Sequence, residues 1–186
     1  MFLARGVKVL RRITYVNSLA ASSGCRKLAT ERTNYISVTS EPEFEGSVAL
    51  IKMQKKPVNS ICSNFCRELI KTVDDLENNE NMRAMIITSA LPGVFSAGLD
   101  FNFLLGATRD DVYNFWRVLQ DTTLKLYGSR LITIAAVNGH CMAGGNLLAL
   151  AADYRVMAES NKISLNETKL VNISLFSSNT VEYYTV

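Results

Sequence analysis

The stretch Leu131-Ile-Thr-Ile-Ala-Ala-Val137, followed by Asn138-Gly-His-Cys-Met-Ala-Gly-Gly145, is an apolar run that ends in a glycine-containing turn. The run over 131–137 predicts a β-strand, and the Leu- and Ala-rich residues 146–152 predict a short helix. Gly144 and Gly145 stand where that helix opens, and backbone N–H groups at such an end lack intrahelical partners and attract anions. Glycine there lets a ligand oxygen approach the backbone closely.

A similar turn, Phe95-Ser-Ala-Gly-Leu-Asp100, follows a second apolar run over 83–88. Further strands are expected at 47–53, 154–157 and 163–165, and a helix at 109–127 with a capping box between Thr108 and Asp111. Another helix should follow Ser60, its predicted N-cap, and bury one face carrying Phe65, Leu69, Val73 and Leu76. Strands that alternate with helices predict an α/β fold with a largely parallel sheet and right-handed crossovers.

The two turns predict a site for a developing negative charge. An N–H group of Ala97 or Gly98 in one turn and one at Gly144 in the other would converge as an oxyanion hole. Losing one such donor typically costs about 2.7–4 kcal/mol of transition-state stabilisation. Glu167 has apolar neighbours, which indicates partial burial and a raised pKa that suits a general base able to return its proton. Two donors facing one carboxylate suit the formation of an enolate.

Other chemistries find little support. The chain lacks G-x-G-x-x-G, Walker and G-x-S-x-G patterns, and its single histidine, His140, has no serine placed to partner it, so it is interpreted as a polar loop residue. Cys62 and Cys66 could share a metal ion from one helix, but without a second cysteine pair they are better interpreted as buried thiols, and no metal is expected. Glycine-rich turns are also common packing devices, so neither turn is specific alone.

The charge is divided unevenly along the chain. Residues 1–30 carry six of the 20 basic residues and no acid, which leaves 14 basic against 17 acidic residues in the remainder. A basic amphipathic segment free of acids predicts a mitochondrial transit peptide over 1–30, with a disordered basic arm as the alternative. The acidic body argues against a nucleic-acid partner, and no apolar run is long enough to predict a membrane span. Residues 31–46, polar and punctuated by Pro42 and Gly46, predict a linker.

These turns, together with Ala152-Asp-Tyr-Arg155, resemble the enoyl-CoA hydratase/isomerase (crotonase) superfamily over about residues 44–170. The resemblance implies a crotonase-like spiral of ββα units. It implies that Ala97 and Gly144 supply the oxyanion N–H groups and that the acyl-CoA site is lined by Gly98, Leu99, Asp100 and Phe101. The first of the two glutamates that family hydratases use would fall at Leu147 and the second at Glu167.

A single acid implies isomerisation of a 3-enoyl-CoA to the trans-2-enoyl-CoA in fatty acid β-oxidation. The resemblance further implies no cofactor beyond the CoA of the acyl-CoA substrate, a homo-oligomer (a trimer in the family), and residence in the mitochondrial matrix. A family-like core is expected over 47–170, incomplete because the C-terminal helical part of the family is missing, and residues 171–186 form an atypical tail. Two alternatives stay open: a weak or inactive chain that acts through subunit association, and a hydratase.

Overall fold

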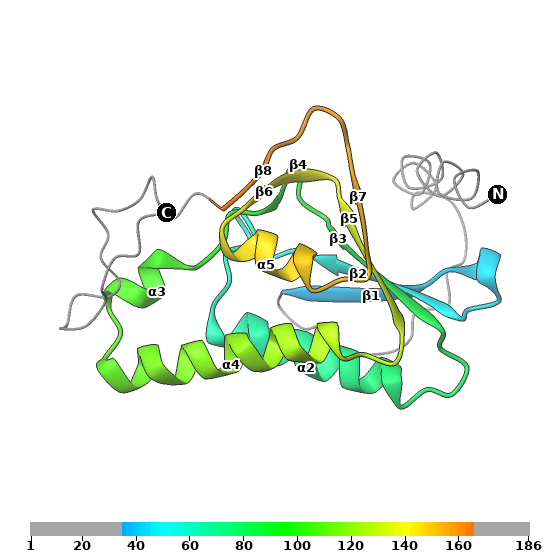
Figure 1. Cartoon of the computed structure of the whole chain (residues 1–186), viewed down its shortest axis with the longest axis horizontal. Coiled ribbons are helices and arrows are strands. Elements are labelled where there is room, and N and C mark those ends of the chain that lie inside the picture. Colours follow the sequence, from blue (N-terminus) through cyan, green and yellow to red (C-terminus); the bar gives the residue numbers. More distant parts are fainter. Residues whose placement is uncertain (1–34, 166–186) are drawn as a thin grey trace, which may run out of the picture.

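The computed structural model describes residues 35–165, which form two sheets and the helices that cover them (Figure 1). The larger sheet has the order β1-β2-β3-β5-β7, and the smaller has the order β4-β6-β8. The strands are β1 (Ile36–Ser40), β2 (Val48–Met53), β3 (Ala84–Ser89), β4 (Gly93–Ser96), β5 (Ile132–Val137), β6 (Gly139–Met142), β7 (Tyr154–Met157) and β8 (Ile163–Ser164). The helices are the 3₁₀ turn η1 (Pro42–Phe44), α2 (Ser63–Glu77), α3 (Phe101–Leu105), α4 (Arg109–Tyr127) and α5 (Gly144–Leu150).

The chain follows a spiral in which each turn contributes one strand to each sheet. β3 leads into β4, β5 into β6 and β7 into β8, with α3 and α4 after the first pair and α5 after the second. All pairs are parallel except β1 with β2. The α/β class, the largely parallel sheet and the spiral of ββα units are therefore confirmed.

Helices α2 and α4 lie side by side beneath the larger sheet (Figure 1), because each has one apolar face. The predicted face of α2 is confirmed, since all four of its residues are buried: Phe65, Leu69, Val73 and Leu76. The Thr108–Asp111 capping box that starts α4 is also present.

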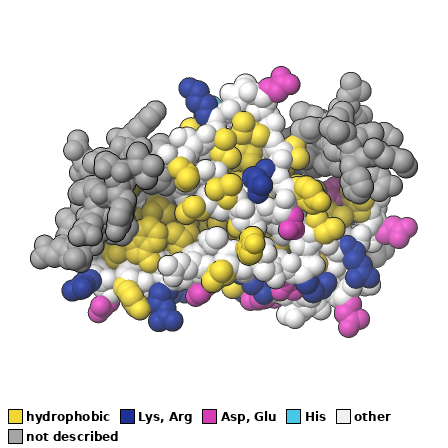
Figure 2. All heavy atoms as spheres, in the orientation of Figure 1, with side chains coloured by type: hydrophobic (Ala, Val, Ile, Leu, Met, Phe, Trp, Pro, Cys, Tyr) yellow, Lys and Arg dark blue, Asp and Glu magenta, His cyan; other side chains and the backbone are white. Residues whose placement is uncertain are grey.

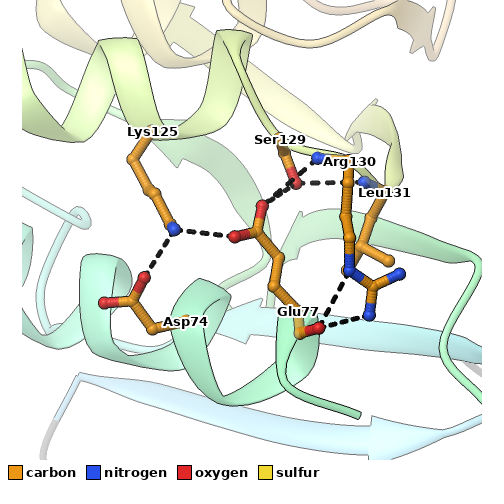
Figure 3. Close-up of polar contacts among 6 residues, drawn as sticks. All are labelled: Asp74, Glu77, Lys125, Ser129, Arg130 and Leu131. Carbon is orange, nitrogen blue, oxygen red and sulfur yellow. Dashed lines mark hydrogen bonds and ion pairs between the residues drawn. The ribbon is translucent and has the colours of Figure 1, made fainter. Parts of the chain in front are cut away.

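Glu77 ties the end of α2 to the segment between α4 and β5 (Figure 3). Its carboxylate accepts hydrogen bonds from Lys125 Nζ at 2.7 Å, Ser129 Oγ at 2.6 Å and the Arg130 N–H at 3.3 Å. The Arg130 guanidinium donates to the Glu77 carbonyl, which is left without a helical partner at the end of α2. Lys125 also pairs with Asp74 at 2.5 Å. This clamp fixes how the two helices sit under the sheet.

The expected linker at 31–46 needs correction over its described part. Residues 36–40 form β1, which pairs antiparallel with β2 in the register Ile36↔Met53, and Ile36 is buried. The apolar side chains of Ile36 and Val38 alternate with polar ones, a pattern that suits a strand with one buried face. The segment was interpreted as a linker because most of its residues are polar. Residues 1–34 and 166–186 lie outside the described part, so the transit segment, the far core boundary and the tail stay predictions.

Ser60 is the second correction. Helix α2 begins at Ser63 with Cys62 as its N-cap and without a side-chain capping hydrogen bond. The Ser60 hydroxyl instead donates to Asp100 Oδ2 at 3.0 Å, across 40 residues of sequence. Ser60 therefore joins a contact between two loops and leaves the helix end uncapped.

The last described turn of the spiral carries exposed apolar side chains: Leu150, Tyr154, Met157, Ile163 and Leu165. On the face drawn in Figure 2, hydrophobic side chains extend over the left and middle of the molecule, while most charged ones lie along its lower and right edges and a few stand at the top and centre. None of the helices within residues 35–165 is both long enough and apolar enough to cross a membrane.

Candidate functional site

The two glycine-containing turns meet backbone to backbone. Gly98 is buried at φ +94°, and a Cβ placed on it would lie 3.1 Å from Gly144 N and 2.9 Å from Ala143 Cβ. A Cβ on Gly145 would lie 2.7 Å from Ser96 Cβ and 2.9 Å from Ser96 O. Side chains at these positions would push the turns apart, so glycine is what allows the contact. The structure thus brings together the two turns that the sequence singled out.

In the first turn, two of the candidate N–H donors are already in use. The Ala97 N–H donates to Val58 O at 3.0 Å, and the Gly98 N–H donates to Ser96 Oγ at 3.2 Å. Residue 97 is also exposed, whereas Gly98 is buried. A ligand oxygen that used either group would have to displace an acceptor that the protein supplies.

The Leu99 N–H, in contrast, has no acceptor within residues 35–165. Leu99 forms a parallel bridge with Ile61, in which the Ile61 N–H donates to Gly98 O at 2.8 Å and the Asp100 N–H donates to Ile61 O at 2.9 Å. These bonds hold the residues on either side of Leu99 and leave its own N–H unused. The sequence predicted that Leu99 lines the site, but it did not indicate that the Leu99 N–H has no acceptor in the described residues.

The second turn offers Gly144. Ala143 at its start has φ +46° and ψ −119°, a conformation that residues with a side chain rarely adopt and that often marks functional sites. The N–H groups of Asn146 and Leu147 donate to Ala143 O, while the Gly144 N–H has no acceptor in the described part of the chain. A Cβ on Gly144 would lie 2.9 Å from Leu99 Cδ2. Two unused donors, at Leu99 and Gly144, therefore belong to residues in contact.

An open cleft of about 1240 Å³ lies beside the first turn. Its wall includes Leu99, Asp100 and Phe101 together with the loop 54–58. The Asp100 carboxylate also caps α3, accepting from the Phe103 N–H at 3.4 Å. The predicted lining residues Ala97, Leu99, Asp100 and Phe101 all face this cleft, and Gly98 lies behind them in the turn.

Lys55 is a residue of this region that sequence reasoning missed. It is buried and pairs with Asp100 Oδ2 at 2.5 Å. Burial alone would raise the pKa of Asp100, but hydrogen bonds from Lys55 and Ser60 lower it below its usual value. Lys56, next in sequence, is exposed, and nothing in the local pattern distinguishes the two lysines.

Glu167 lies outside the described residues, so its position stays a prediction. The last described strand, β8, ends at Ser164, three residues before it. Ser164 O accepts a hydrogen bond at 2.8 Å from the N–H of Ala143, the residue that directly precedes Gly144. Leu147, where the resemblance places the first hydratase glutamate, is half-buried on α5.

The remaining reactive side chains are structural in character. The His140 ring is exposed, and its Nδ1 accepts from the Lys162 N–H at 3.1 Å. The three cysteines of the described part are buried, as expected for thiols used as small apolar side chains. Burial raises the pKa of Cys66 to about 11 and that of Cys141 to about 12. Within residues 35–165, no group of three His, Cys, Asp or Glu side chains could hold a metal ion.

Known proteins resemble this chain in sequence. The sequence profile of the Enoyl-CoA hydratase/isomerase family matches residues 43–178. The chain is 40% identical over 155 residues to the human protein "Enoyl-CoA delta isomerase 1, mitochondrial", a match covering 82% of this chain and 50% of the relative. It is 36% identical over 133 residues to human mitochondrial methylglutaconyl-CoA hydratase, covering 72% of this chain and 39% of that protein.

A solved structure matches as well. The crystal structure of human mitochondrial delta3-delta2-enoyl-CoA isomerase superposes with a TM-score of 0.69 at 41% identity, covering 74% of this chain and 53% of the other. The chain therefore spans about half the length of the relatives it matches.

Proposed function

The chain belongs to the enoyl-CoA hydratase/isomerase family, and from that premise we propose that it converts a 3-enoyl-CoA into the trans-2-enoyl-CoA. The supporting observation is the contact between Leu99 and Gly144, two residues from different turns whose N–H groups have no acceptor within residues 35–165. Two such donors aimed at one thioester oxygen stabilise the negative charge that develops when a proton leaves C2.

The first donor in this proposal is the Leu99 N–H. The sequence prediction assigned that role to Ala97, whose N–H donates to Val58 O. An oxyanion hole works because its donors are organised before the charge appears, so an N–H already bonded to a carbonyl suits the role less than an unused one. Gly144 keeps the second role, and its helix N-terminus adds favourable partial positive charge.

Glu167 is proposed as the acid/base. Its carboxylate removes a proton from C2, the C2–H electron pair moves toward the thioester, and the oxygen becomes a dienolate oxyanion. The protonated Glu167 then delivers the same proton to C4, where the C3=C4 π electrons form the new C–H bond. The C1=C2 electrons of the dienolate move to form the C2=C3 double bond, and the thioester carbonyl re-forms as the oxyanion gives back its electron pair. Glu167 follows Ser164 by three residues, a chain span of at most about 11 Å, and Ser164 is bonded beside the second turn. That reach supports the assignment.

Isomerisation is favoured over hydration because of Leu147. A hydratase must hold and activate a water molecule, and the family's first glutamate for that task would stand at this position. A leucine side chain has no hydrogen-bonding group to hold water. The human methylglutaconyl-CoA hydratase among the relatives keeps hydration as the competing function.

The wider setting is proposed from the same resemblance. The only cofactor-like group would be the CoA of the substrate, and the protein would act in fatty acid β-oxidation in the mitochondrial matrix, as the mitochondrial relatives suggest. A homo-oligomer is part of the proposal. The exposed apolar side chains of the last spiral turn support the alternative that the chain acts through association with other subunits.

One assay separates these functions. Purified protein is given a 3-enoyl-CoA, and product is followed by chromatography; a 2-enoyl-CoA is tested in parallel for water addition. We expect the trans-2-enoyl-CoA from the first substrate and no 3-hydroxyacyl-CoA from the second. Water addition above background would favour a hydratase, whereas no reaction with either substrate would favour the association role.

A further inference from the structure

Lys55 carries a buried charge close to the proposed oxyanion hole. Its Nζ lies 2.5 Å from Asp100 Oδ2 and 2.6 Å from Ser60 Oγ, and it sits 5.6 Å above the ring of Tyr35. Lysine is rarely buried unless its charge is paired, because desolvation is costly. The contacts of Lys55 with these partners therefore restrict the position of the loop 55–61.

Asp100 connects this charge to the first turn. The residue directly follows Leu99, and its N–H donates to Ile61 O at 2.9 Å. One carboxylate oxygen accepts from both Lys55 and Ser60, and the other caps α3 through the Phe103 N–H. Movement of Asp100 would therefore disturb the ion pair, the cap and the bridge beside Leu99 together.

The turn is thus held from one side by the loop 55–61 at both the main-chain and the side-chain level. The N–H groups of Ala97 and Asp100 donate to the carbonyls of Val58 and Ile61, respectively. The Lys55 ammonium forms an ion pair with the Asp100 carboxylate. The main-chain hydrogen bonds fix the distance between the turn and the loop 55–61. The ion pair resists movement of the loop along the turn. A partly buried, hydrogen-bonded pair resists displacement better than an exposed one.

We propose that Lys55 is a positioning residue that, through its ion pair with Asp100, holds the Leu99 N–H in the direction of the thioester oxygen. This rests on the proposed function. Lys55 would touch no reacting atom, so its loss should lower kcat more than it changes KM. Misplacing a reacting group by about 1 Å can cost as much as 10²-fold in rate.

The test uses Lys55→Met, Lys55→Arg and Asp100→Asn in the full chain. Asparagine at 100 can still cap α3, so that variant removes the ion pair while keeping the cap. Lys125→Met is the matched control, because it removes a paired lysine that contacts Asp74 and Glu77 on α2. Steady-state kinetics with a 3-enoyl-CoA and amide hydrogen exchange are measured on each variant.

We expect Lys55→Met and Asp100→Asn to lower kcat by about 10- to 100-fold, with KM changed less than threefold, and Lys55→Arg to restore most of the rate. The amides of Ile61 and Asp100, bonded across the bridge at Leu99, should exchange faster in both variants. Lys125→Met should lose stability without either effect. Unchanged kcat and unchanged exchange in Lys55→Met would overturn the inference.

The two proposals fail in different ways. If the parent chain turns over no 3-enoyl-CoA, the proposed function fails, and hydrogen exchange at Ile61 and Asp100 still decides whether Lys55 holds the turn. If the parent chain is active and Lys55→Met raises exchange evenly throughout the protein rather than at Ile61 and Asp100, the role of Lys55 is merely structural and the inference is wrong.

Discussion

Replacing Gly145 with alanine tests the contact that builds the site. The new Cβ would lie 2.7 Å from Ser96 Cβ and 2.9 Å from the Ser96 carbonyl oxygen. Carbon atoms in contact rest about 3.5–4.0 Å apart, so helix α5 and the first turn would have to separate by about 1 Å. Gly145 has an ordinary helical backbone, which means that the clash is purely steric.

The expected cost follows from that displacement. Forcing an extra methyl group into a packed contact typically destabilises a protein by about 1–3 kcal/mol. For a chain of this length, that corresponds to a fall in Tm of about 2–12 °C. Because the same movement separates Leu99 from Gly144, turnover of a 3-enoyl-CoA should also fall, by up to about 10²-fold.

Urea denaturation followed by circular dichroism measures the free energy of unfolding, and Gly106→Ala is the control. A Cβ at Gly106 would have no neighbour closer than Asn102 O at 4.0 Å, and its φ of −99° is open to alanine. We expect the control to change stability by less than about 0.5 kcal/mol. If Gly145→Ala proved as stable and as active as Gly106→Ala, the two turns could not be in the contact described here.

Two further predictions concern parts of the molecule away from the turns. Hydrogen bonds from Lys125 and Ser129 outweigh the effect of burial and lower the pKa of Glu77. The ionised Glu77 carboxylate therefore contributes to the free energy of unfolding above about pH 4, and this contribution is lost as the pH falls below that value. Urea titrations should therefore show Glu77→Gln less stable than the parent by about 1–2 kcal/mol at pH 7, with the difference vanishing near pH 2; an unchanged difference would contradict the assignment. Burial raises the pKa of Cys66 to about 11 and of Cys141 to about 12, so at pH 8 at most about one molecule in a thousand carries either thiolate. Alkylation mapped by mass spectrometry should label both cysteines only in the unfolded protein, and rapid labelling of the native protein would show that they are accessible.

The larger sheet except β1, together with its covering helices, could be predicted because the patterns of these elements are long and regular. β3 and β5 are near-continuous apolar runs, and α4 has both a capping box and an apolar face. Of the small sheet only β8 was expected, since β4 and β6 have four residues each and overlap the segments 95–100 and 138–145 that indicated turns. The pairing of β4 with β6 depends on the packing of one turn of the spiral on the next, and a local sequence pattern does not indicate such long-range packing.

The sequence indicated the two turns, but it did not indicate which N–H group of the first turn has no acceptor within residues 35–165. Whether an N–H is available depends on which acceptor lies opposite, and the acceptors for Ala97 and Asp100 are the carbonyls of Val58 and Ile61, far away in sequence. Ala97 and Leu99 cannot be distinguished without that information. Lys55 was missed for a similar reason, because its partner Asp100 is 45 residues away.

In the proposed reaction, one carboxylate moves a proton between C2 and C4 of an acyl-CoA held by two backbone donors. The most direct measurement is the kcat for a 3-enoyl-CoA of Glu167→Gln, with Glu159→Gln as the control because Glu159 is exposed on the surface. Glutamine keeps the size of the side chain and cannot exchange a proton, so we predict a loss of about 10²–10⁴-fold in kcat, with the control unchanged. Turnover by Glu167→Gln equal to that of the parent protein would contradict the acid/base role proposed for Glu167.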